Sequence, residues 1–140
     1  MRTLLAALAG FVVMFAVNGL LAALVIGPLV EDRYEEVIAD EPSFGLLIAG
    51  YVIIAIAMAL LYPRLQPGVN WLSTSLIAGA FVGGAAFLGV HTVITGYTNI
   101  DALGFISSGA FDSLGVIAGM LAVGYVYERG QARAAAAAGR

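Results

Sequence analysis

The feature that most restricts the fold of this chain is the length of its uncharged segments. Uncharged runs of 28, 22 and 36 residues separate Arg2 from Glu31, Glu41 from Arg64, and Arg64 from Asp101. A helix of about 20 apolar residues crosses the hydrocarbon core of a bilayer. Charged residues make up 11% of the chain, against about 25% in soluble domains. The chain is therefore predicted to be an integral membrane protein. This excludes a soluble enzyme, a secreted disulfide scaffold and a nucleic-acid-binding protein.

The pattern predicts an all-α membrane protein with four transmembrane helices in one antiparallel bundle, a single domain over residues 1–140. The helices are expected at about 3–30, 44–62, 71–95 and 103–128. The first is too long for the apolar region of a signal peptide, which has about 7–15 residues. The Gly27-Pro28 pair is expected to end or kink it. The alanine-rich segment 130–140 is expected to be a tail, either frayed helix or disordered.

A short acidic segment joins the first two predicted helices. Residues 31–43 hold six acidic side chains and one arginine, a net charge of −5. Tyr34, Val37, Ile38 and Glu41 are spaced three or four apart, which suggests a short interfacial helix with its apolar side on the membrane. Six acids could hold a hard cation loosely, but calcium loops have a defined ligand spacing and a glycine turn. A solvated acidic loop is the preferred interpretation, and Ser43 is expected to cap the second helix.

The arginines predict the orientation, because basic residues favour cytoplasmic loops. One side of the predicted topology holds Arg2, Arg64, Arg129, Arg133 and Arg140, whereas Arg33 lies among acids on the other side. Both termini are therefore expected in the cytoplasm, with the acidic segment outside. The expected location is a bacterial inner membrane.

Small residues are expected to hold the helices together, because lipid removes the hydrophobic drive for helices to associate. Small-xxx-small pairs join Gly79 to Gly83, Ala80 to Gly84, and Gly115 to Gly119. The preferred interpretation is that these residues pack the third helix against the fourth. The alternative is a dimer contact on the outside of the bundle.

Three polar residues lie at depths in the membrane where a polar side chain costs free energy. At 1.5 Å per residue, Asp112 is about 13 Å below the outer end of the fourth helix, and Asn18 is about 22 Å from the cytoplasmic start of the first. His91 is about 30 Å along the third helix, near the outer surface. These residues could form one polar cluster in the outer half of the membrane. Its expected neighbours are Thr92, Thr95, Ser107 and Ser108.

Each residue of the predicted cluster has a structural and a functional interpretation. Asn18 is expected to make an interhelical hydrogen bond, and His91 to be a structural or solvated histidine. For Asp112 the two interpretations are balanced, because intramembrane acids often mark functional sites. A protonated Asp112 bonded to Ser108, Asn18 or His91 would instead be structural.

Other chemistry is largely excluded by composition. The absence of cysteine excludes thiolate catalysis and Fe–S ligation, and a single histidine excludes a His-cluster metal site. The sequence has no P-loop, no G-x-S-x-G and no H-E-x-x-H. Axial ligation of a haem or chlorophyll by His91 is possible in principle, with no supporting residue. No enzyme activity, cofactor or metal is predicted.

The layout resembles a bacterial family of small, uncharacterised four-helix membrane proteins. The matching features are a polar residue two-thirds along the first helix (Asn18), the element Gly96-Tyr97-Thr98-Asn99, and Phe111-Asp112-Ser113-Leu114-Gly115. In that family the first-helix residue is usually acidic and a Trp usually lies near the fourth-helix Asp. The chain lacks both, which weighs against a proton mechanism between two acids. The family has no established activity, so the resemblance implies the fold.

Three functions are compatible with the sequence. The first is a non-catalytic accessory or assembly subunit that binds a larger membrane complex or lipid, with other membrane subunits or a second copy as partner. The second is a small oligomeric proton-linked transporter that uses Asp112 and His91. The third, an enzyme acting on a lipid, lacks a nucleophile–base pair.

Overall fold

The computed structural model describes residues 1–28, 43–65 and 70–139, and all regular structure there is helical. The acidic segment predicted over 31–43 lies outside the described residues except for Ser43. The elements are α1 (Arg2–Leu21), the π-helix η1 (Ala22–Ile26), α3 (Phe44–Leu61), the 3₁₀-helix η2 (Tyr62–Leu65), α4 (Trp71–Gly83), the π-helix η3 (Gly84–Gly89), α5 (Val90–Thr95) and α6 (Ala102–Ala138).

Four continuous helices are long and apolar enough to cross a membrane, over Arg2–Ile26, Phe44–Leu65, Trp71–Thr95 and Ala102–Ala138. The predicted all-α class with four transmembrane helices is therefore confirmed. The last helix is longer than expected, because α6 runs without interruption from Ala102 through the alanine-rich segment to Ala138. Of the two states considered for that segment, the structure has the helix.

Side-chain caps explain where three of the helices begin. A side-chain oxygen at the N-cap accepts a hydrogen bond from a backbone N–H that has no partner within the helix. The pairs are Leu46 N to Ser43 Oγ (3.5 Å), Ser73 N to Asn70 Oδ1 (3.1 Å) and Gly104 N to Asp101 Oδ2 (2.9 Å). The cap predicted at Ser43 is present.

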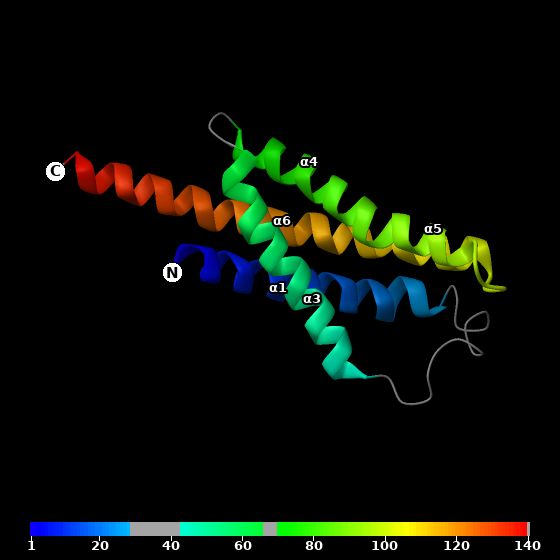
Figure 1. Cartoon of the computed structure of the whole chain (residues 1–140). Helices are drawn as coiled ribbons and strands as arrows, with labels where there is room; N and C mark the ends of the chain where they lie inside the picture. The colour runs from blue at the N-terminus through cyan, green and yellow to red at the C-terminus, as the bar shows by residue number, and fades with distance from the viewer. Residues whose placement is uncertain (29–42, 66–69, 140) are drawn as a thin grey trace.

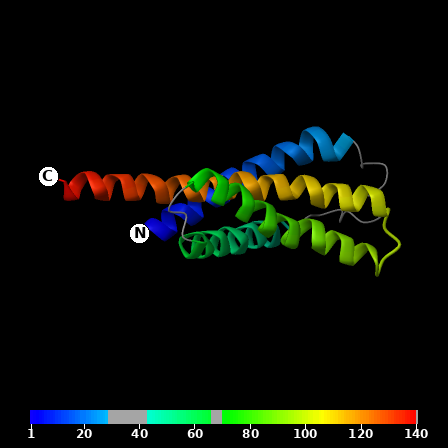
Figure 2. The same cartoon turned by 90° about the horizontal axis from the view of Figure 1, so that it is seen from above.

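Helix α6 is the central element. It contacts α1 and α4 extensively, and also η3, α5 and α3. Figures 1 and 2 show α1 and α4 antiparallel to α6, with both termini toward the same end of the molecule. Helix α3 is inclined across α1 in Figure 1 and packs mainly on that helix.

Two glycines of the third span contact α6 as predicted. A methyl group added to Gly79 would lie 2.8 Å from Cα of Ile117, and one added to Gly83 would lie 2.8 Å from the carbonyl oxygen of Ser113. Gly84 does not take part in this contact, because a methyl group there would meet nothing within 4 Å. The expectation that Gly84 packs against the fourth helix is wrong.

The other predicted pair, Gly115 and Gly119, packs on a different helix from the one expected. A methyl group on Gly119 would lie 2.9 Å from the carbonyl oxygen of Gly10 and 3.0 Å from Cβ of Met14, both in α1. One on Gly115 would overlap the side-chain amide of Asn18, also in α1. Helix α6 therefore packs α1 on one face and α4 on another, and small residues allow the close approach at both contacts.

The core fills the half of the molecule that lies toward the two termini. Its fully buried side chains include Met14, Met58, Val116, Met120 and Val123. Beside them Tyr62 and Tyr127 stack with ring centroids 5.5 Å apart, and Tyr127 donates to the Ala59 carbonyl at 2.9 Å. The polar residues of the candidate site come from the opposite half of the spans.

Candidate functional site

Asn18 is buried between α1, α3 and α6. Its side chain is 2% exposed, and Nδ2 donates to the hydroxyl of Tyr51 in α3 at 3.1 Å. Oδ1 is buried and has no hydrogen-bond partner within the described residues. The amide lies against Gly115, where any larger residue would overlap it. The predicted interhelical hydrogen bond of Asn18 is present, and it ties α1 to α3.

Asp112 faces a groove of about 310 Å³, called here the Asp112 groove. The half-buried carboxyl comes from α6, and the other walls come from α3 and η3. Its remaining lining is apolar except for one phenol: Leu46, Leu47, Gly50, Tyr51, Ile54 and Phe87. None of the hydrogen bonds within the described residues involves the Asp112 carboxyl. The groove therefore presents a carboxyl group within an apolar surface.

Tyr51 lines the groove beside Asp112, and His91 lies against Phe87, another residue of the lining. The ring of Phe87 lies next to both, with centroids 6.2 Å from Tyr51 and 6.2 Å from His91. Asn18 joins this group through its bond to Tyr51. These four polar residues, Asn18, Tyr51, His91 and Asp112, form what is called here the Asp112 cluster.

His91 is held tightly by its surroundings. Nδ1 lies 2.8 Å from the carbonyl oxygen of Phe87, and the imidazole packs on Phe105 with centroids 4.3 Å apart. A carbonyl only accepts hydrogen bonds, so Nδ1 is the donor in this contact. Gly109 allows this approach, because a methyl group there would lie 2.7 Å from the imidazole Cγ.

The π-helix η3 decides which residues share the face of His91. A π-turn closes its hydrogen bonds over five residues, so it shifts the register of an α-helix by about one residue. Regular α-helical spacing places Gly84 on the His91 face, whereas the structure places Gly83 toward α6. The register shift explains both the error at Gly84 and the contact of His91 with Gly109.

The hydroxyl residues expected around the cluster do not join it. Thr95 donates to the backbone carbonyl of His91 at 2.8 Å, and Thr92 and Ser107 bond carbonyls of their own helices in the same way. Ser108 lies one turn before Asp112 in α6, and no hydrogen bond of its hydroxyl occurs within the described residues. Of the predicted members, Asn18 and His91 each contact a residue that lines the Asp112 groove, Tyr51 and Phe87 respectively.

Sequence reasoning missed two residues that matter at this site. The first is Tyr51, and the sequence could have indicated it, because it is the only polar side chain between Phe44 and Leu61. Ser113 is buried in α6, and its hydroxyl lies 2.9 Å from the Gly83 carbonyl and 2.8 Å from that of Gly109. In the sequence Ser113 stands out only as part of the element Phe111-Asp112-Ser113-Leu114-Gly115, and nothing there indicates a bond to the third span, because a small residue in a membrane helix fits many positions.

The Asp112 carboxyl can accept hydrogen bonds from a donor in the groove. Among the described residues no three His, Asp or Glu side chains are grouped as metal ligands. Comparison of the chain with models of protein families, with curated proteins and with solved structures finds no match.

Proposed function

We propose that this chain is a non-catalytic accessory or assembly subunit, and that it binds a helix of a larger membrane complex in the Asp112 groove. The observation that supports this proposal is the carboxyl of Asp112, which lies in a groove that is apolar apart from the Tyr51 phenol and has no hydrogen bond to any described residue. An acid inside a membrane is costly, and such residues usually pair with another polar group.

The walls of the groove suit a second helix. Leu46 and Leu47 of α3 are 76% and 46% exposed, so none of the described residues covers this face of α3. A methyl group on Gly50 would meet nothing within 4 Å, which leaves bare backbone at the groove. Bare backbone allows two membrane helices to approach closely. A partner helix that places a basic or hydrogen-bond-donating side chain at the depth of Asp112 would satisfy the carboxyl.

The second candidate is a proton-linked transporter that works as an oligomer. It is favoured by the position of His91 against Phe87 in the lining of the Asp112 groove, because carboxyl and imidazole side chains are the groups that carry protons in membrane transporters. The helices of one chain leave little room for a solute pathway, so this function requires several copies.

Affinity purification from native membranes separates the two functions. Wild type, Asp112→Asn, Asp112→Leu and the charge-matched control Glu128→Gln are solubilised in mild detergent, and co-purifying proteins are identified by mass spectrometry. We expect a membrane protein to accompany the wild type and Glu128→Gln, and Asp112→Leu to lose it. Asparagine keeps the shape and hydrogen-bonding capacity, so Asp112→Asn should retain at least part of the partner.

Two results would overturn this proposal. Equal recovery of the partner with Asp112→Leu would remove the groove from the interface. Proton-driven uptake of solute into liposomes by the wild type, lost in a folded Asp112→Asn variant, would favour the transporter, because asparagine cannot titrate.

A further inference from the structure

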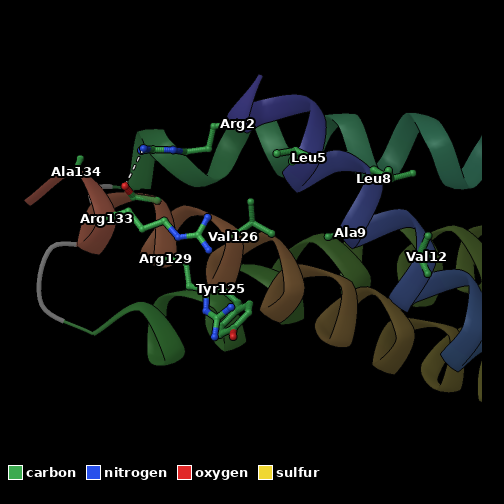
Figure 3. Close-up of a pocket in the computed structure, with 11 residues that line it drawn as sticks. Arg2, Leu5, Leu8, Ala9, Val12, Tyr125, Val126, Arg129, Arg133 and Ala134 are labelled. Atoms are coloured by element: carbon green, nitrogen blue, oxygen red, sulfur yellow. Dashed lines mark hydrogen bonds between the residues drawn. The ribbon is translucent and has the colours of Figure 1, made fainter. Parts of the chain in front are cut away.

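A larger groove lies between α1 and α6, near the end of the molecule that holds both termini (Figure 3). It has a volume of about 860 Å³ and is called here the arginine groove. Three guanidinium groups lie toward one end of it, and apolar residues of α1 follow one another away from them. Its lining is Arg2, Leu5, Leu8, Ala9, Val12, Tyr125, Val126, Arg129, Gly130, Arg133 and Ala134.

Two of the arginines are fixed in place by the protein. Arg2 donates from Nη2 to the carbonyl oxygen of Gly130 at 2.9 Å, and a methyl group on Gly130 would lie 2.6 Å from the Arg2 Cζ. Arg129 holds its Cζ 4.9 Å from the centre of the Tyr125 ring. A guanidinium has five N–H donors, so one bond to a carbonyl leaves Arg2 with capacity for an anion.

The charge of the groove is uniformly positive. Its lining includes three arginines and no acidic residue. Glu128 is adjacent to Arg129 in sequence but is not part of the lining. The groove therefore favours a ligand with a negative charge.

The rest of the groove favours a ligand with a long apolar part. Leu5, Leu8 and Val12 are each more than half exposed, and they follow Arg2 over about 15 Å of helix. This stretch of α1 belongs to a membrane span, so its exposed side chains face the hydrocarbon of the bilayer. Arg2 is the first residue of this span, and Arg129 and Arg133 lie beside it in α6, at the end of the molecule where lipid headgroups are.

We propose that the arginine groove is a binding site for an anionic phospholipid, with the phosphate on Arg2, Arg129 and Arg133 and an acyl chain along Leu5, Leu8 and Val12. Basic pockets between membrane helices bind anionic headgroups in this way. The positive-inside rule assigns this end to the cytoplasmic side, where anionic lipids attract basic residues. This site is separate from the Asp112 groove, and it does not rest on the function proposed there.

Native mass spectrometry of the full chain in detergent tests the site, with phosphatidylglycerol and phosphatidylcholine of identical acyl chains as probes. The wild type should retain phosphatidylglycerol in preference. The variant Arg129→Gln/Arg133→Gln should bind it about thirty-fold more weakly, or by about 2 kcal/mol. This variant keeps Arg2, whose bond to Gly130 joins the two helices. Arg64→Gln removes one arginine charge outside the groove, which matches the single variant Arg133→Gln, and it should bind as the wild type does.

Equal retention of the two lipids, or an equal loss in Arg64→Gln, would overturn the site in favour of general charge attraction. If the double variant unfolds, Arg133→Gln alone replaces it, with an expected loss of about five-fold. A photoreactive residue in place of Leu8 identifies the occupant in native membranes. Cross-links to phospholipid support the proposal, and cross-links to a protein overturn it.

Discussion

At the scale of single residues, Asn18 shows how a polar group is accommodated inside the membrane. One end of its amide is bonded to Tyr51 at 3.1 Å, while the other end is buried without a partner in the described part of the chain. Leaving a buried polar group unpaired costs about 1–3 kcal/mol. The bond to Tyr51 therefore limits that cost to one end of the amide and couples α1 to α3.

We expect Tyr51→Phe to lower the thermal stability of the purified protein in detergent by about 1 kcal/mol, because it leaves the Asn18 amide without its partner. Tyr97→Phe is the matched control, since Tyr97 is 88% exposed. Circular dichroism during heating measures both. A Tyr51→Phe variant as stable as the wild type would show that Asn18 contributes nothing through this bond.

At the scale of helices, the contacts depend on positions where only glycine fits. Gly79 and Gly83 bring the third span against Ile117 and Ser113, while Gly119 brings α6 against Gly10 of α1. Lipid tails are as apolar as the helix side chains, so the hydrophobic effect does not drive the helices together. Close contact between backbones stabilises these helix pairs instead. Ser113 adds a hydrogen bond to the Gly83 carbonyl at the same contact.

The neighbouring residues Gly83 and Gly84 allow a matched test of the contact between α4 and α6. A methyl group at Gly83 would lie 2.8 Å from the Ser113 carbonyl oxygen, so Gly83→Ala should destabilise the fold by about 1–3 kcal/mol. A methyl group at Gly84 has open space around it, so Gly84→Ala should leave the stability unchanged. Thermal unfolding in one detergent compares the two variants. An equal effect at both positions would contradict this packing.

The same reasoning applies to α1 on the opposite face of α6. Gly119→Leu should separate Gly10 and Met14 from α6 and lower the melting temperature, because its first added carbon already lies 2.9 Å from the Gly10 carbonyl oxygen. Gly19→Leu in α1 is the control, since nothing lies within 4 Å of that site. An unchanged melting temperature for Gly119→Leu would mean that this face of α6 looks at lipid.

At the scale of the whole molecule, one long helix organises the other three. With 37 residues α6 is about 55 Å long, longer than the roughly 30 Å hydrocarbon core. It also has the largest buried share of the four spans, 33% against 17%. The buried core packs the helices together near the two termini, and the Asp112 cluster lies toward the opposite end of the molecule.

The distribution of arginines predicts that both termini are cytoplasmic and that the turn around Thr98 is outside. Reporters that are active only in the cytoplasm or only in the periplasm, fused at the C-terminus and inserted after Thr98, test this in cells. We expect opposite readings at the two sites. Periplasmic activity at the C-terminus would reverse the orientation and move the arginine groove to the outer side.

The sequence by itself determined the class of the protein and its spans. Backbone groups in lipid must be bonded within the segment, so an uncharged run of this length becomes a helix. The cap at Ser43 followed from local chemistry in the same way. The tertiary structure decided which face each helix buries. Lipid and a neighbouring helix are equally apolar, so the sequence does not distinguish a face that contacts lipid from a face that contacts another helix. This equal apolarity explains why the sequence points Gly119 to the wrong partner helix. The register shift at Gly84 comes from the π-helix η3, and Tyr51 joins the site because the tertiary structure places it both against Asn18 and along the Asp112 groove.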